Sequence, residues 1–125
     1  MDKESKIDST KELCYSFRKK GDIRNGKLLN FSNMLKGYSF EFLGHNFNDS
    51  ECAYISGCYT SNNEHCLRIQ NELSVYEKGG YNAKAEYRKA KVEDSINTPY
   101  MRTDWNTFNF QWMLLVLWYK VNNNL

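Results

Sequence analysis

Several residue types that would assign this chain to a familiar class are scarce. Proline occurs once, at Pro99, and β-branched residues are sparse, which favours helices over an all-β fold. With two histidines and no C-x-x-C pair among four cysteines, the sequence has none of the usual zinc-ligand spacings. Cys52 and Cys58 lie on one predicted helix, where a disulfide has poor geometry, so we expect free thiols in a reducing compartment.

Long apolar runs and a strong net charge are also lacking. The charged N-terminus has no apolar segment, so no secretory signal peptide is predicted. The apolar run from Trp112 to Trp118 is too short to span a bilayer. Seventeen basic residues nearly balance fifteen acidic ones, so charge alone does not predict nucleic-acid binding. We therefore expect a cytoplasmic protein without a membrane anchor, a metal or a cofactor.

Aromatic residues make up 15% of the 125 residues, which is enough apolar surface for one small core. Residues 1–12 are polar and charged and are predicted to form an extension, while residues 13–125 form a single domain. The expected fold is α+β and mostly α. A small N-terminal antiparallel hairpin or sheet would pack on a helical bundle.

Residues 30–59, with the sequence NFSNMLKGYSFEFLGHNFNDSECAYISGCY, combine three structural signals. Aromatic and other residues alternate over 38–43, which predicts a strand with one aromatic face. Gly44-His45 can turn the chain, and the polar residues 48–50 offer helix N-cap chemistry. A helix is therefore predicted to begin at or near Glu51.

Glu51 begins a helical face that is otherwise apolar, because Ile55, Cys58 and Tyr59 follow at helical spacing. Two interpretations are open. A carboxylate in the first turn of a helix is stabilised by the helix dipole, and position alone favours this structural role. Alternatively, Glu51 faces a cavity and does chemistry there.

Before this stretch, residues 13–18 alternate as a strand that can pair with the strand at 38–43. Residues 19–27 are predicted to be a loop with a turn at Asn25-Gly26. The loop's four cations are most simply solvated, and phosphate contact is the alternative.

After it, residues 64–76 are predicted to form an amphipathic helix, with His65 on its surface and Gly79-Gly80 ending the element. Residues 82–92 form another helix and 93–102 a loop. The last helix, over residues 105–122 with Thr103 or Asp104 as its cap, should be the central buried helix, with Trp112 and Trp118 in the core.

Lys84, Arg88 and Lys91 form a basic stripe on the helix predicted over residues 82–92. A solvated charged face is the simpler interpretation. The alternative is a clamp for a substrate phosphate, because guanidinium matches phosphate geometry.

Short motifs in a particular order resemble the NADAR family, over most of the chain from about Asn30 to the end. The matching pieces are Phe31-Ser32-Asn33, Phe42-Leu43-Gly44-His45-Asn46-Phe47, Asp49-Ser50-Glu51-Cys52-Ala53-Tyr54, Ala83-Lys84, Tyr87-Arg88, Arg102-Thr103-Asp104-Trp105-Asn106 and Met113.

The resemblance implies a mostly helical, N-glycosidase-like domain that acts on phosphoribosyl or ADP-ribosyl groups joined to a nitrogen base. Family members act on riboflavin-pathway intermediates or remove ADP-ribose from guanine in nucleic acid. Carried over, Glu51 matches the catalytic glutamate and Trp105 an aromatic that flanks the substrate. The resemblance also favours Arg88, with Lys84, as a phosphate contact. Asn33 and Arg102 are candidate contacts to ribose or phosphate.

The chain departs from the family pattern in three ways. Cys52 stands where the family usually has His or Gln, and the usual lysine two turns into that helix is absent. The chain also stops before a family segment that carries a further acidic residue. It is therefore a fragment, a chain completed by a partner, or a reduced relative without turnover. A second copy or a partner chain would then cover part of the C-terminal helix.

Three functions are consistent with these features. The first is an N-glycosidase or ADP-ribosyl glycohydrolase, whose substrate is a free nucleotide or modified nucleic acid. The second is a non-catalytic binder of ADP-ribose or a related nucleotide. The third is an interaction module completed by a partner at its apolar helix. A role in phage–host conflict would fit a small, shortened relative of such a family.

Overall fold

The structure is a computed structural model that describes residues 22–24, 27–29, 32–94 and 100–125. In this part of the chain, four α-helices follow two short antiparallel hairpins, which confirms the expected mostly helical α+β class. The elements are β1 (Asp22–Arg24), β2 (Lys27–Leu29), β3 (Phe40–Phe42), β4 (His45–Phe47), α1 (Ser50–Ser56), α2 (Glu64–Asn71), the 3-10 helix η2 (Leu73–Val75), α3 (Gly79–Asp94) and α4 (Trp105–Asn123).

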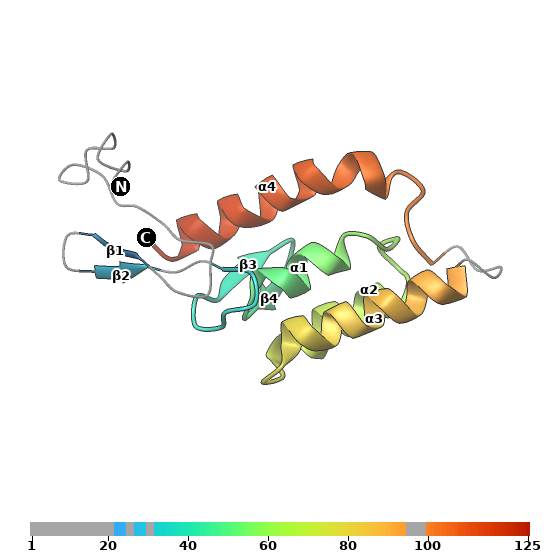
Figure 1. Cartoon of the computed structure of the whole chain (residues 1–125), viewed down its shortest axis with the longest axis horizontal. Helices are drawn as coiled ribbons and strands as arrows, with labels where there is room; N and C mark the ends of the chain where they lie inside the picture. The colour runs from blue at the N-terminus through green and yellow to red at the C-terminus, as the bar shows by residue number, and fades with distance from the viewer. Residues whose placement is uncertain (1–21, 25–26, 30–31, 95–99) are drawn as a thin grey trace.

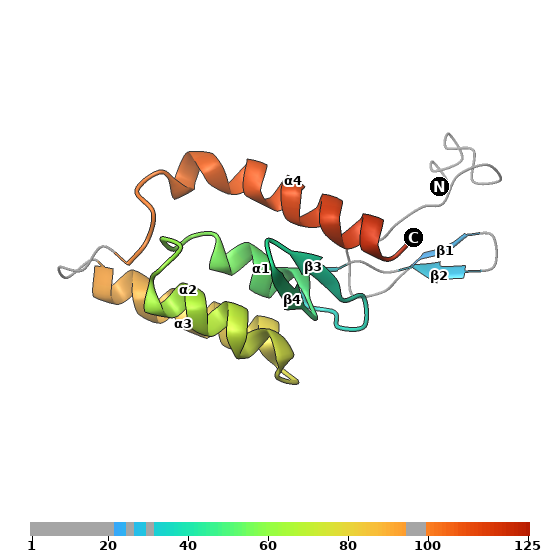
Figure 2. The same cartoon turned by 180° about the vertical axis from the view of Figure 1, so that it is seen from behind.

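The helices form two sides with α1 between them. Helix α4 runs along one side, while α2 and α3 run along the other (Figure 1). The β3–β4 hairpin packs against α4 and α2 beside α1, and the view from behind shows the same order (Figure 2). Helix α1 is therefore the element around which the core is built.

The β3–β4 hairpin confirms the aromatic strand but shifts its turn. Phe40 pairs with Phe47 and Phe42 with His45, so the two connecting residues are Leu43 and Gly44. Both have positive φ, 51° and 84°, as a two-residue hairpin turn requires. His45, which was predicted to lie in the turn, begins β4. The buried phenylalanine rings of the hairpin lie against the helices.

The predicted loop over residues 19–27 was wrong in part, because Asp22–Arg24 pairs with Lys27–Leu29 as the β1–β2 hairpin. The turn signal was recognised, yet three residues on each side suffice for a ladder when the turn is favourable. The strand predicted over residues 13–18 lies outside the described residues.

Helix α1 begins as predicted but ends at Ser56, so Cys58 and Tyr59, which were expected on its apolar face, lie beyond the helix. Asp49 is its N-cap residue, and the Asp49 side chain accepts a hydrogen bond of 2.8 Å from the backbone N–H of Cys52. Six of the seven residues of α1 are buried, because α2 and α3 cover one side of the helix and α4 the other.

Two boundaries after α1 differ from the prediction. The helix expected over residues 64–76 ends at Asn71, and the chain tightens into the 3-10 helix η2. Gly79-Gly80 begins α3 instead of ending the preceding element. A Cβ on Gly80 would lie 2.6 Å from the Met34 sulfur, so glycine here permits close packing rather than a chain break.

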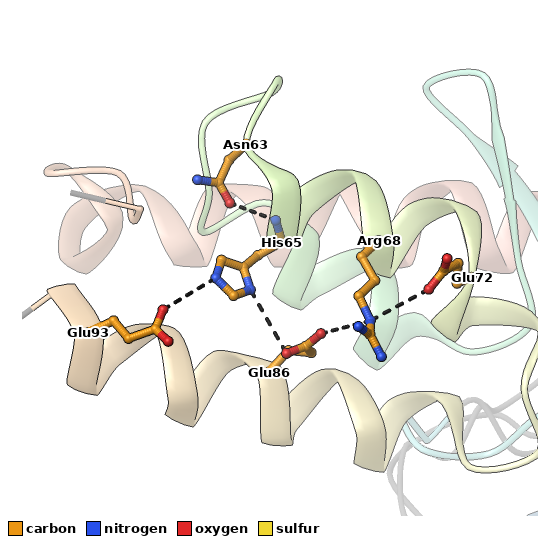
Figure 3. A network of polar contacts seen from close by, with 6 residues as sticks. All are labelled: Asn63, His65, Arg68, Glu72, Glu86 and Glu93. Atoms are coloured by element: carbon orange, nitrogen blue, oxygen red, sulfur yellow. Dashed lines mark hydrogen bonds and ion pairs between the residues drawn. The ribbon is translucent and has the colours of Figure 1, made fainter. Parts of the chain in front are cut away.

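A polar network joins α2 to α3, as Figure 3 shows. The His65 nitrogens lie 3.9 Å from a Glu86 oxygen and 3.7 Å from a Glu93 oxygen, and the Arg68 guanidinium lies 2.9 Å from Glu86. The prediction that His65 lies on the surface was wrong. Its side chain is 13% exposed, and its ring stacks on Tyr59 at a centroid distance of 5.4 Å.

Helix α4 is not the central buried helix that its composition predicted. The indole N–H of Trp112 donates a 3.0 Å hydrogen bond to the carbonyl oxygen of Ala53, which fixes one face of α4 to α1. Trp118, expected in the core, lies on the opposite face and is 66% exposed. Asp104 occupies the N-cap position without a side-chain capping bond.

The described cysteines, Cys52, Cys58 and Cys66, are free and buried. Within residues 32–94 and 100–125, no group of three His, Cys, Asp or Glu side chains is arranged to hold a metal. No helix in the described ranges is long and apolar enough to cross a membrane.

Candidate functional site

Glu51 is held at the start of α1 by the loop before β3. Its backbone N–H donates a hydrogen bond of 3.0 Å to the carbonyl oxygen of Asn33. The Glu51 residue is only 8% exposed, although it carries a carboxyl group. Burying a carboxyl group is costly, which marks this position for a functional explanation.

The side chain of Glu51 lines a cavity of about 270 Å³ between three helices. Helix α1 contributes three residues, α3 three and the start of α4 one. The lining residues are Glu51, Tyr54, Ile55, Lys84, Tyr87, Arg88 and Trp105. Four of the residues selected from the sequence, Glu51, Lys84, Arg88 and Trp105, are thus brought together although they span 55 positions of the chain.

Burial is the main cause of a raised pKa at Glu51, because desolvation disfavours the carboxylate. The positive charge of Lys84 opposes this shift, and so does a hydrogen bond from the Asn33 side chain. The negative charge of Asp49 adds to it. The result is a carboxyl group that takes up a proton more readily than an exposed glutamate does, as a general base requires.

The aromatic side of the cavity is made by Trp105 and Tyr54, whose ring centroids lie 5.2 Å apart. Trp105 is 7% exposed and begins α4. The segment before it is anchored to the end of α1, because the Arg102 N–H donates a 2.8 Å hydrogen bond to the Cys58 carbonyl and Met101 bridges to Tyr59. This anchoring places Trp105 in the lining of the cavity to which Glu51 also contributes.

The basic side is made by Lys84 and Arg88, which are one helical turn apart on α3 and are exposed. Lys91, the third member of the predicted stripe, does not line the cavity. Its ammonium group lies 5.9 Å from the centre of the Tyr87 ring. The stripe therefore divides into two cavity cations and one that packs on an aromatic ring.

A buried polar chain that the sequence did not reveal supports Asn33. The Ser50 hydroxyl donates to Asn33 Oδ1 at 2.8 Å, and the Lys120 ammonium donates to Ser50 Oγ at 3.0 Å and to the Ser32 carbonyl at 3.2 Å. Lys120 is fully buried, and this burial lowers its pKa to about 8. The sequence did contain one indication of this buried cation, because Lys120 is the one charged residue of an otherwise uncharged helix.

Arg102 is placed elsewhere. It lines a second, larger cavity of about 850 Å³, to which Glu51 does not contribute. Its guanidinium makes two 2.9 Å bonds to the Asp104 carboxylate and lies 4.0 Å from the centre of the Phe108 ring. The charged side chains lining this cavity are Arg102 and Asp104, which already neutralise each other. The smaller cavity with its buried carboxyl group is therefore the candidate site.

No family model, curated protein or solved structure matches this chain. What the structure itself defines is a small α+β domain, mostly helical, with a cavity that combines a buried carboxyl group, two cations and three aromatic rings. Tyr54 and Tyr87 are lining residues that the sequence analysis missed. Their signal was helical spacing, since Tyr54 lies three positions after Glu51 and Tyr87 three after Lys84.

Proposed function

We propose that this chain is an N-glycosidase that hydrolyses the bond between a ribosyl or ADP-ribosyl group and a nitrogen base, with Glu51 as the catalytic carboxylate. One observation carries the proposal. A largely buried carboxyl group, two cations and an indole from three helices line one cavity. A phosphorylated ribosyl–base compound has an electrophilic sugar carbon, an anionic group and a flat base, and each has a counterpart there.

The chemistry needs one carboxylate and one water molecule. When the C–N bond breaks, its electron pair goes to the base nitrogen and positive charge builds on the sugar. The Glu51 carboxylate stabilises that charge and accepts a proton from the attacking water, whose oxygen bonds to the sugar carbon. The proton then passes to the base nitrogen. The products are the free base and the ribose with a new hydroxyl group.

Cavity size and charge define how the substrate would lie. At about 270 Å³ the cavity is slightly smaller than most small-molecule sites, so it suits the ribose and part of the base. The phosphate groups would lie at Lys84 and Arg88, which are exposed and reach the solvent-accessible side. A larger substrate, such as ADP-ribosyl-guanine in nucleic acid, would extend beyond the cavity.

The experiment compares the unmodified chain with Glu51→Gln and with Glu41→Gln, which removes an exposed carboxylate of β3 and serves as the control. Each protein is incubated with DNA that carries ADP-ribosylated guanine, and with free ADP-ribosyl and phosphoribosyl compounds, and products are read by mass spectrometry. We expect sugar release by the unmodified chain and the control and none by Glu51→Gln. Absence of release from every substrate by the folded, unmodified chain would refute the glycosidase.

The second candidate is a nucleotide binder without turnover, and Cys52 favours it. The position after Glu51 usually carries His or Gln in the family that the chain resembles, whereas Cys52 is fully buried and its thiol faces Asp49 Oδ2 at 3.7 Å. Cys52 therefore contributes nothing to the cavity. Titration calorimetry with an ADP-ribosyl–base compound separates the two candidates, because a binder gives saturable heat and leaves the compound intact, whereas a glycosidase releases the free base.

A further inference from the structure

Helix α4 exposes an apolar stripe on the side that faces away from α1. Phe110, Leu114 and Trp118 recur every four residues and are 68%, 52% and 66% exposed. Leu115, which is 40% exposed, widens the stripe, and Tyr119 borders it at 37% exposed while its ring packs on Phe42 at a centroid distance of 5.4 Å. Isolated exposed apolar residues are ordinary, but five on one helix form a continuous surface.

The inner side of α4 packs on β3 and α1, and none of the other described helices lies along its outer side (Figures 1 and 2). The outer side also carries no charge. The one charged residue of α4 is Lys120, which is fully buried and faces Ser32 and Ser50. An identical stripe can therefore approach without like-charge repulsion, and no complementary charge is needed from a partner.

The exposed area meets the minimum for a specific pair. With side chains of about 150–250 Å² each at these exposed fractions, the stripe offers roughly 500 Å². That value lies in the upper half of the range for the largest apolar patch of a monomer, and such patches are often functional. Two copies would together bury about 1,000 Å², which is the minimum expected of a specific interface.

We infer that α4 is the interface of a homodimer in which two copies pack stripe to stripe around a two-fold axis at Leu114. The stripe is nearly symmetric about this residue, with an aromatic side chain one turn before it and another one turn after it. A two-fold axis there places Phe110 against Trp118 of the partner subunit, and Trp118 against Phe110 of the partner subunit. None of these residues lines the Glu51 cavity, so the dimer leaves that site open.

Sedimentation equilibrium of the full chain at tens of micromolar tests the dimer. We expect the mass of two chains for the unmodified protein and of one chain for the double variant Phe110→Glu, Trp118→Glu. The control is Val75→Glu, which places the same charge on an apolar side chain of η2 that is 59% exposed, and it should stay dimeric. Circular dichroism verifies that each variant is folded. A single-chain mass for the unmodified protein would overturn the inference, and so would a double variant that still sediments as two chains.

A cross-linking experiment tests the position of the axis. Leu114→Cys, in a Cys14→Ser background, should form a disulfide-linked dimer under mild oxidation, because the two copies of residue 114 face each other across the axis. Val75→Cys in the same background should remain uncross-linked. Failure of the Leu114→Cys chain to cross-link while it sediments as a dimer would refute this arrangement.

Discussion

The peptide N–H of Glu51 and the carbonyl oxygen of Asn33 form a 3.0 Å hydrogen bond, so the loop before β3 holds the first turn of α1. The Asn33 side chain also bonds to the Glu51 carboxyl group and lowers its pKa, against the effect of burial. Asn33 therefore acts on both the position and the proton affinity of the candidate catalytic group.

Asn33→Ala should lower turnover by about tenfold to a hundredfold, because a small displacement of a catalytic group has effects of that size. It should also raise the pKa of Glu51 further, since the side-chain hydrogen bond to the charged form is lost. The acidic limb of the pH–activity profile should then move to higher pH. A lower rate with an unmoved profile would show that Asn33 does not act on the ionisation of Glu51.

Glu51→Gln should make the protein more stable at neutral pH by about 1 kcal/mol, as is common when a functional group is replaced. Burial raises the folded-state pKa of Glu51 above the ordinary 4.5, so the folded state binds the proton more tightly than the unfolded state. Above the folded-state pKa, the charged carboxylate therefore lowers the free energy of unfolding. Below the ordinary value of 4.5 this destabilisation disappears, because Glu51 is protonated in both states. Urea unfolding of both proteins at neutral pH and at about pH 4 measures the difference in stability. The extra stability of Glu51→Gln should vanish at about pH 4.

If Glu51→Gln is instead less stable than the unmodified chain at neutral pH, the attraction between Glu51 and Lys84 outweighs desolvation. Glu41→Gln is the matched control, because Glu41 is exposed on β3. Its stability should change little, as for most surface substitutions.

Arg88→Ala and Lys84→Ala should each raise the KM for phosphorylated substrates by about tenfold, the usual effect of one charge-assisted contact. Lys84→Ala should in addition raise the pKa of Glu51, because the positive charge that lowers it is removed. Steady-state kinetics as a function of pH and salt measure both effects.

Lys91→Ala and Arg102→Ala are the controls for this pair, because neither residue lines the Glu51 cavity. Both should keep an unchanged KM. A rise in KM for Arg102→Ala equal to that for Arg88→Ala would show that the substrate also reaches the larger cavity.

The local signals of the sequence predicted the start of α1 and the β3 strand well, but not the end of α1 at Ser56. Asp49 caps α1 as expected, and the alternating aromatics of β3 face the core. These features depend on residues that are neighbours in the chain. Four cavity residues were selected because short motifs marked them, although their proximity depends on how α3 and α4 pack on α1.

The wrong predictions concern features that depend on contacts between elements far apart in the chain. Composition suggested that α4 is buried all round, but β3 and α1 cover only one side of it, and Trp118 remains exposed. Glycine usually breaks a helix, whereas here Gly79 packs against the Leu73 carbonyl oxygen and Gly80 against the Met34 sulfur, and neither position leaves room for a Cβ without a shift. The burial of His65 was not visible in the sequence, because its carboxylate partners are 21 and 28 positions away.

Gly57→Ala should destabilise the protein by about 2–4 kcal/mol, because a Cβ on Gly57 would overlap the indole ring of Trp112. The ring would have to move and would lose its hydrogen bond to the Ala53 carbonyl. Thermal unfolding and tryptophan fluorescence measure the loss and the displacement. Gly37→Ala is the control: its Cβ meets no atom, so the cost should be that of the positive φ alone, about 1–2 kcal/mol. Equal losses for both variants would contradict tight packing of α4 on α1.

Lys120→Met should destabilise the protein by about 1–3 kcal/mol at neutral pH, because Ser50 and the Ser32 carbonyl lose a donor and Asp49 loses a nearby cation. The loss should grow as the pH rises. The folded-state pKa of Lys120 is about 8 and its ordinary value is 10.5, so between these values the unfolded state binds more protons and Lys120 adds stability with rising pH.

The difference between the unmodified chain and Lys120→Met should therefore increase by up to about 3 kcal/mol between pH 8 and 10.5. Other groups that ionise in this range are common to both proteins and cancel in the comparison. Lys91→Met, at an exposed position of α3, is the matched control and should show no such trend. Urea unfolding of the three proteins between pH 8 and 10.5 measures how this difference changes with pH. A constant difference would mean that the Lys120 ammonium is not held in a desolvated site, and that the polar chain to Asn33 does not depend on its charge.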